Sequence, residues 1–75
     1  MTPWRFPNPV ILPHDPVIDY LRLSVALGQP SRQLIHSWKK RRAFPASYRS
    51  GSTVFYMTDH VEQWLKDQNV KTNRV

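Results

Sequence analysis

The sequence predicts a mainly α fold of three helices with one small β-hairpin, and three observations support this fold class. Apolar residues recur at helical spacing in three segments, over about 16–27, 31–41 and 59–68. Each segment begins beside a residue type that caps helix N-termini. Between the second and third segments, aromatic and β-branched residues stand on both sides of the turn Ser50–Ser52, which is typical of a hairpin.

The composition of the chain limits its size, chemistry and compartment. A chain of 75 residues forms one small domain, and without cysteine it has neither disulfides nor thiolate metal ligands. Hydrophobic residues make up 40% of the chain, too many for a disordered basic tail. No apolar run approaches the roughly 18 residues of a membrane span, and prolines interrupt the N-terminal region. We therefore expect a folded protein of the cytoplasm with no membrane partner.

The N-terminal segment, residues 1–14, is expected to be an extended, proline-rich arm. Proline disfavours helix at its own position and at the residue before it. Four of the seven prolines of the chain lie in this segment: Pro3, Pro7, Pro9 and Pro13. The same segment carries apolar residues that need cover from water: Trp4, Phe6, Val10, Ile11 and Leu12. We expect the arm to dock on its own domain or on a neighbouring copy.

The first helix is predicted over about 16–27. Asp15 is a favourable N-cap, Pro16 suits the first helical position, and Gly28 suits the residue after the end. The stripe expected to face the core consists of Val17, Ile18, Leu21 and Val25, with Leu27 nearby. The turn Gly28–Ser31 separates this helix from the next by about three residues, which is the spacing of a helix-turn-helix.

The second helix, over about 31–41, has one apolar and one basic face. At about 100° per residue Leu34, Ile35 and Trp38 share one side, which we expect to be core. The other side carries groups that suit base edges in the major groove of DNA: Ser31, Arg32, Gln33, His36, Ser37 and Lys40. The basic residues expected to contact phosphates are Lys39, Arg41 and Arg42. Phe44 and Pro45 end the helix, and Phe44 is expected to tuck beneath it.

The hairpin after Pro45 has a polar tip and an aromatic root. The hairpin residues expected at DNA are Tyr48, Arg49, Ser50, Gly51, Ser52 and Thr53. Two interpretations stay open for Tyr48 and Tyr56: either ring reaches a phosphate or covers the root of the hairpin. Trp38 and Trp64 are expected in the core, because each lies on an apolar stripe.

The third helix is predicted over about 59–68, leaving residues 15–68 as the folded domain and 69–75 as a flexible tail. Thr58 or Asp59 is the expected N-cap, and the spacing of Asp59 and Glu62 suits a variant of the capping box. The apolar stripe of this helix is Val61, Trp64 and Leu65.

The charge distribution favours a polyanionic partner. The net charge is +6 and the isoelectric point about 10.4. All five acids lie before Tyr20 or after Thr58, so the stretch from Ser31 to Tyr56 is purely cationic. A solvated surface is the ordinary explanation of a charged run, but such segregation favours nucleic acid.

From about Tyr20 to Lys66 the chain resembles the small winged helix-turn-helix proteins of phages and mobile elements. That group includes the excisionases (recombination directionality factors), the AlpA-type regulators and the wider MerR-like proteins. The matching features are the turn Gly28–Ser31, the pair Ile35 and Trp38, the junction Phe44-Pro45, the pair Phe55-Tyr56 and the segment Asp59–Leu65. The resemblance implies a winged helix-turn-helix fold of three helices plus a two-stranded wing.

The resemblance also implies sequence-specific binding of double-stranded DNA. An excisionase binds adjacent sites, bends DNA and directs a site-specific integrase toward excision, in the nucleoid of a bacterial host cell. Two alternatives stay open: an AlpA-type transcriptional regulator, and a basic module for single-stranded nucleic acid or RNA, which needs exposed aromatic rings. A domain this small reads few base pairs, so we expect contacts between neighbouring copies on DNA.

The residue inventory does not favour catalysis or metal binding. His14, His36 and His60 lack the spacing of metal ligands, and the chain is too short to enclose a catalytic cleft. We therefore expect no enzyme activity, no metal, no cofactor and no small-molecule substrate.

Overall fold

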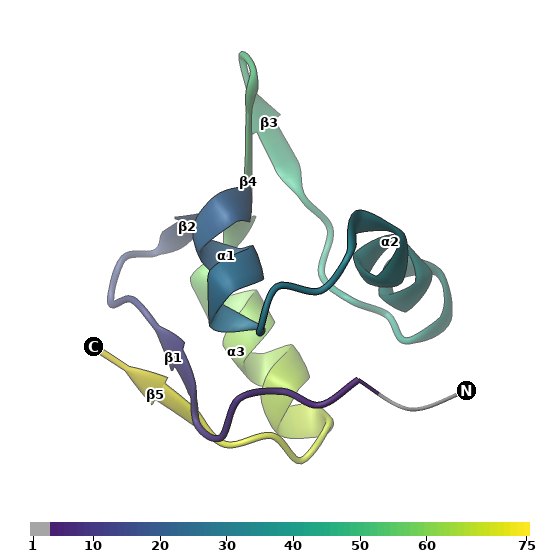
Figure 1. Cartoon of the computed structure of the whole chain (residues 1–75). Helices are drawn as coiled ribbons and strands as arrows, with labels where there is room; N and C mark the ends of the chain where they lie inside the picture. The colour runs from purple at the N-terminus through teal and green to yellow at the C-terminus, as the bar shows by residue number, and fades with distance from the viewer. Residues whose placement is uncertain (1–3) are drawn as a thin grey trace.

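A computed structural model describes residues 4–75, which form three helices and five short strands (Figure 1). In chain order these are β1 (Val10–Leu12), β2 (Val17–Asp19), α1 (Tyr20–Ala26), α2 (Arg32–Arg41), β3 (Tyr48–Ser50), β4 (Thr53–Met57), α3 (Thr58–Asp67) and β5 (Thr72–Arg74). Strands β1 and β5 pair in parallel, and β2, β4 and β3 form an antiparallel sheet in the order β2-β4-β3.

The prediction of a mainly α, winged helix-turn-helix fold is wrong. The structure is 38% helix and 24% strand, divided between two sheets, and is a small α/β fold. The hairpin is not an isolated two-stranded wing, since β2 pairs with its second strand. A further sheet joins segments from the two ends of the chain.

The segment before α1 explains the first of these differences. Residues 17–19 form β2 rather than the first turn of a helix, with Ile18 opposite Tyr56 in the register of β4. Helix α1 begins at Tyr20 because Asp19, not Asp15, is its N-cap: the Asp19 Oδ1 atom accepts a hydrogen bond from the Arg22 amide at 2.8 Å. Pairing with β4 buries Ile18, which is 2% exposed.

The later start of α1 also overturns the predicted core stripe. Leu21 and Val25 are 75% and 64% exposed, and Val17 in β2 is exposed as well. Leu23, which lies outside the predicted stripe, is fully buried, whereas Ile18 and Leu27 are buried as predicted. Leu23 and Leu27 are four apart and share one helical face, which the arm and the sheet cover. Gly28 follows the helix with φ +90, so the predicted end of the helix is confirmed.

The N-terminal arm packs on its own domain. Trp4 Nε1 donates a hydrogen bond to the Leu27 carbonyl at 2.9 Å, and the Phe6 ring lies 5.4 Å from the Trp38 ring between centroids. Val10 and Leu12 in β1 are fully buried. The arm is therefore part of the hydrophobic core; its first residues, 1–3, lie outside the described range.

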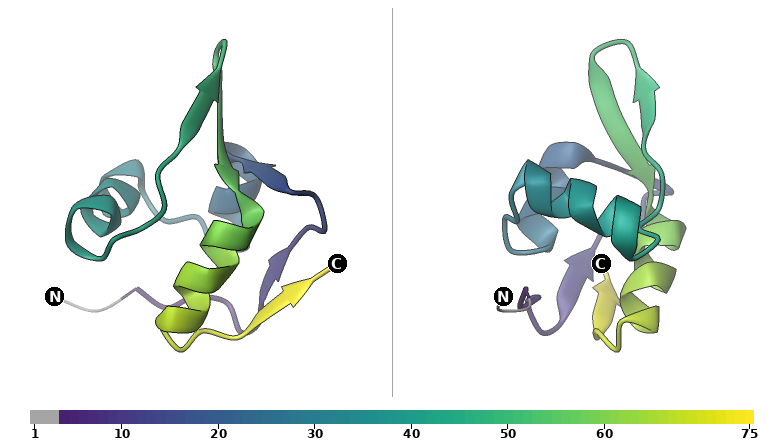
Figure 2. Two further views of the ribbon diagram at one scale, coloured as in Figure 1. Left: turned by 180° about the vertical axis from the view of Figure 1, so that it is seen from behind. Right: turned by 90° about the vertical axis from the view of Figure 1, so that its right-hand side faces the viewer.

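The C-terminal segment differs from the expected flexible tail. Strand β5 pairs with β1 beside α3 (Figure 2), and Arg74 joins the two ends of the chain. Arg74 donates to the Pro13 carbonyl at 2.7 Å, to Asp59 at 2.9 Å and to Glu62 at 3.2 Å. The hydrogen bond with Asp59 is the main cause that raises the pKa of Arg74.

The start of α3 likewise differs from the predicted capping box. The N-cap is Met57, which has no side-chain oxygen and makes no capping hydrogen bond. Asp59 and Glu62 bind Arg74 instead of the helix terminus. The hydroxyl of Thr58 is buried and has no hydrogen-bond partner among the described residues. The Thr58 amide at the start of α3 donates instead to the Pro16 carbonyl at 3.0 Å.

The centre of the core is an aromatic cluster that fixes α2 in place. Trp38 and Trp64, 4% and 6% exposed, have ring centroids 5.5 Å apart, which confirms the prediction that both are core. The ring centroids of Phe44 and Trp64 are 4.7 Å apart, and Phe44 packs beneath α2 as expected. Trp64 Nε1 donates to the Arg42 carbonyl at 2.8 Å, which gives a partner to one of the free carbonyls at the C-terminal end of α2.

Candidate nucleic-acid interface

The outer face of α2 is exposed because the opposite face is anchored in the core. Ser31 caps the helix as predicted, its Oγ atom accepting from the Leu34 amide at 3.1 Å. Ile35 and Trp38 are buried, so the rest of the helix turns outward. The predicted recognition residues Ser31, Arg32, Gln33, His36 and Lys40 are exposed, and Ser37 is half-buried.

The three basic residues assigned to phosphates do not share one environment. Arg41 and Arg42 are exposed at the end of α2. Lys39 is half-buried: its Nζ atom donates to Ser47 Oγ at 3.2 Å and lies 5.2 Å from the centre of the Tyr56 ring. Lys39 is thus held on the side of α2 that faces the hairpin.

The β3–β4 hairpin is exposed along its tip. The predicted hairpin residues Tyr48, Arg49, Ser50, Gly51, Ser52 and Thr53 are all exposed. Gly51 has φ +60 as the first of the two residues between the strands, a conformation that favours glycine at this position of a hairpin turn. Tyr48 stacks on Phe55 at 5.8 Å, whereas Tyr56 is buried in the core.

The two exposed elements are separate surfaces. The hairpin projects beyond the rest of the molecule, while α2 lies to one side of its root (Figures 1 and 2). Between α2, the hairpin and the start of α1 is an open notch of about 620 Å³. We define the notch by six of its lining residues: Asp19, Tyr20, Arg32, Lys39, Ser47 and Tyr56.

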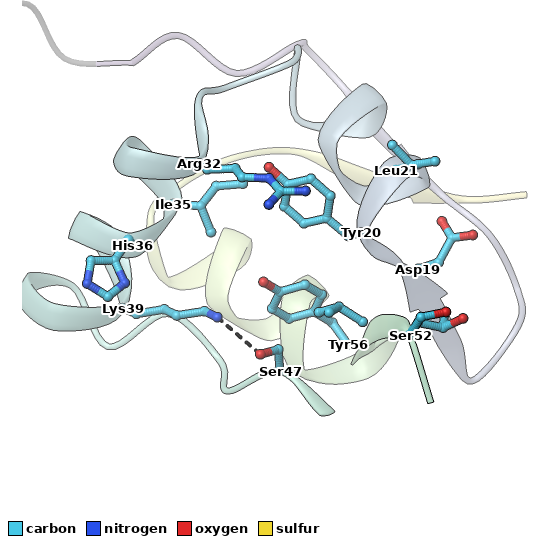
Figure 3. Close-up of a pocket in the computed structure, with 12 residues that line it drawn as sticks. Asp19, Tyr20, Leu21, Arg32, Ile35, His36, Lys39, Ser47, Ser52 and Tyr56 are labelled. Atoms are coloured by element: carbon cyan, nitrogen blue, oxygen red, sulfur yellow. Dashed lines mark hydrogen bonds between the residues drawn. The ribbon is translucent and has the colours of Figure 1, made fainter. Parts of the chain in front are cut away.

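Two cations on α2 face the notch, each over an aromatic ring (Figure 3). The guanidinium carbon of Arg32 lies 5.1 Å from the centre of the Tyr20 ring. The ammonium nitrogen of Lys39 lies 5.2 Å from the centre of the Tyr56 ring. Both distances are within the range of a cation–π interaction, which holds a cation in place while leaving its charge uncompensated.

The cations of α2 and the hairpin form no ion pair within residues 4–75. Three of the five acids pair elsewhere: Asp15 with Arg22 at 3.6 Å, and Asp59 and Glu62 with Arg74. Asp19 is the one carboxylate among the notch residues. The positive charge of α2 and the hairpin is therefore available to an external anion.

Sequence reasoning placed the exposed cations but missed the aromatic supports of the notch. The sequence pattern places Tyr20 in the first predicted helix and indicates no role for Ser47. Neither residue carries a local signal, because each contacts α2 only in the folded chain: Tyr20 through Arg32 and Ser47 through Lys39. Arg32 was assigned to base edges on helical angle alone, which does not show that its side chain lies over Tyr20.

Residues 4–75 hold no cluster of three or more histidine, aspartate or glutamate side chains placed to bind a metal ion. None of the helices in the described range has the length and apolar character needed to cross a membrane. None of the known protein families, curated proteins or solved structures compared with the chain matches it.

Proposed function

We propose that the chain binds double-stranded DNA in a sequence-specific manner through the outer face of α2 and the β3–β4 hairpin. The observation that carries this proposal is the set of exposed cations on these two elements, none of which has an acidic partner among the described residues. Phosphate neutralisation by such cations supplies most non-specific affinity for DNA. Gln33 and Lys40 are among the base-reading candidates on the outer face.

The disposition of the aromatic rings supports duplex over single-stranded nucleic acid. A protein that binds single strands presents rings on which bases stack. Trp38, Trp64 and Tyr56 are buried. Within residues 4–75 Tyr48 is the aromatic residue with an exposed ring, and it stacks on Phe55. One exposed ring makes a weak platform for successive bases.

We further propose that the protein acts as an excisionase beside a site-specific integrase in a bacterial cell. This role rests on the resemblance of the sequence, and an AlpA-type regulator is the alternative because both roles use DNA binding. The arm was one candidate for the contact between neighbouring copies, and docking on its own domain was the other possibility. Since it packs on its own domain, cooperation between copies on DNA has lost that support.

Fluorescence anisotropy with labelled duplex, single-stranded DNA and RNA tests the binding proposal. We expect duplex to bind tightest, with a log–log salt slope of about −0.9 per phosphate contacted, or roughly −5 for six contacts. Arg41→Gln and Arg49→Gln should weaken binding to all duplexes. Lys66→Gln and Lys71→Gln remove the same charge from exposed positions on α3 and before β5, and serve as matched controls.

Specificity is tested with a duplex selected from a random pool and a scrambled duplex. Gln33→Ala should cost about 1–3 kcal/mol on the selected duplex and far less on the scrambled one. If the two lysine controls lost as much affinity as the α2 or hairpin variants, the loss would be an effect of net charge alone. That result would contradict the proposed surface. Tighter binding to RNA or single strands would also contradict it.

Footprinting separates the two biological roles. The protein is applied to the attachment site of its element and to its own promoter, with and without integrase. Protection of tandem sites at the attachment site that changes the outcome of recombination supports the excisionase. Protection restricted to the promoter supports the regulator.

A further inference from the structure

Arg32 and Lys39 occupy the same side of α2, facing the notch. They are seven residues apart, which is close to two helical turns and about 10.5 Å along the axis. Both line the notch together with the root of the hairpin. Two side chains that start two turns apart on one side of a helix can each reach a different phosphate, so the pair suits a stretch of a phosphate chain.

The two cations are held in position before any ligand binds. Arg32 stacks over Tyr20, which is half-buried, and Lys39 lies over the buried Tyr56. A stacked guanidinium keeps the N–H groups along its edge free to donate, and an ammonium that donates once to Ser47 keeps two further donors. Prior ordering of both side chains lowers the entropy cost of binding an anion.

The position of the notch agrees with the path of a DNA strand. In duplex DNA a sugar–phosphate strand separates the major groove from the adjacent minor groove. When α2 occupies one groove and the hairpin tip the next, the strand between them passes over the notch. Contacts there are made to phosphates and carry no base information.

We propose that the notch binds a stretch of phosphate backbone, with Arg32 and Lys39 each contacting a phosphate. The inference rests on the proposed DNA binding and deepens it. It also changes the role of Arg32 from reading bases to neutralising phosphate. Asp19 borders the notch, and its negative charge opposes a bound phosphate and lowers the affinity of the site.

The first test compares Arg32→Gln and Lys39→Gln with Lys40→Gln, which removes a charge from the outer face of α2. Affinities are measured on the selected and the scrambled duplex. We expect each notch variant to lose about tenfold on both duplexes, with a salt slope smaller by about 0.9. Loss confined to the selected duplex for Arg32→Gln would show that it reads bases and would overturn the proposal.

A second variant is expected to strengthen binding, and a gain in affinity cannot result from misfolding. Asp19→Asn removes the carboxylate charge but keeps an equally good N-cap for α1. Asp67→Asn raises the net charge by the same amount at the far end of α3. We expect Asp19→Asn to bind both duplexes several-fold tighter than Asp67→Asn does. Equal affinities for the two variants would contradict a phosphate at the notch.

Titration with inorganic tripolyphosphate separates the notch from the proposed function. Amide and lysine resonances are followed by NMR at constant ionic strength, with sodium chloride as the reference. We expect saturable shifts at Arg32, Lys39 and Ser47 that disappear in the double variant Arg32→Gln, Lys39→Gln. Shifts of this kind in a protein that fails to bind duplex would refute the proposed function and keep the phosphate site. Duplex binding without these shifts would overturn the phosphate site at the notch and leave the proposed function standing.

Discussion

Replacing Leu12 by alanine tests whether the arm belongs to the hydrophobic core. Leu12 is 0% exposed in β1, and truncating a leucine in such a position costs about 3 kcal/mol. A domain of 75 residues has roughly 4–11 kcal/mol of stability in total. Each kcal/mol lowers the melting temperature of a domain this small by about 4–8 °C, so we expect Leu12→Ala to melt roughly 12–24 °C below the natural sequence.

Ile11→Ala is the matched control, since it shortens a branched aliphatic side chain on the same strand. Ile11 is 45% exposed, and we expect its truncation to cost less than about 1 kcal/mol. Both variants are melted by far-UV circular dichroism at two protein concentrations. An unchanged melting temperature on dilution indicates that Leu12 packs within its own chain. Equal melting temperatures for the two variants would refute the inclusion of the arm in the core.

Two further predictions concern the C-terminal half. Arg74→Met should lower the melting temperature and speed hydrogen exchange in β5, because it removes the hydrogen bonds to Pro13, Asp59 and Glu62. Lys71 is an exposed residue just before β5, and Lys71→Met should do neither. Equal effects of the two substitutions would contradict the role of Arg74 in joining the ends of the chain. Thr58→Val should raise the melting temperature by about 4–8 °C, because it replaces a buried hydroxyl without a partner by a methyl group of similar shape. A fall in the melting temperature of Thr58→Val would contradict the absence of a partner for this hydroxyl.

The elements that could be predicted from the sequence are those with local signals. The start of α2 follows from Ser31, whose hydroxyl bonds an amide three residues on. The hairpin follows from Gly51 between Tyr48 and the aromatic and β-branched run Thr53–Tyr56, and the end of α1 follows from Gly28. The exposed cations of the candidate interface follow from the apolar face of α2, since burial of Ile35 and Trp38 turns the basic face outward.

Only the tertiary structure decided how the ends of the chain and the first helix are arranged. Asp15 and Asp19 are both competent N-caps, and pairing of Val17–Asp19 with β4 selects the second. Strands β1 and β5 gain their backbone partners from opposite ends of the chain, which leaves no mark on a local pattern. Arg32 shows the same limit at the interface, because the ring beneath it belongs to another helix. Local sequence sets the conformations a segment favours, whereas burial and pairing between distant segments select among them.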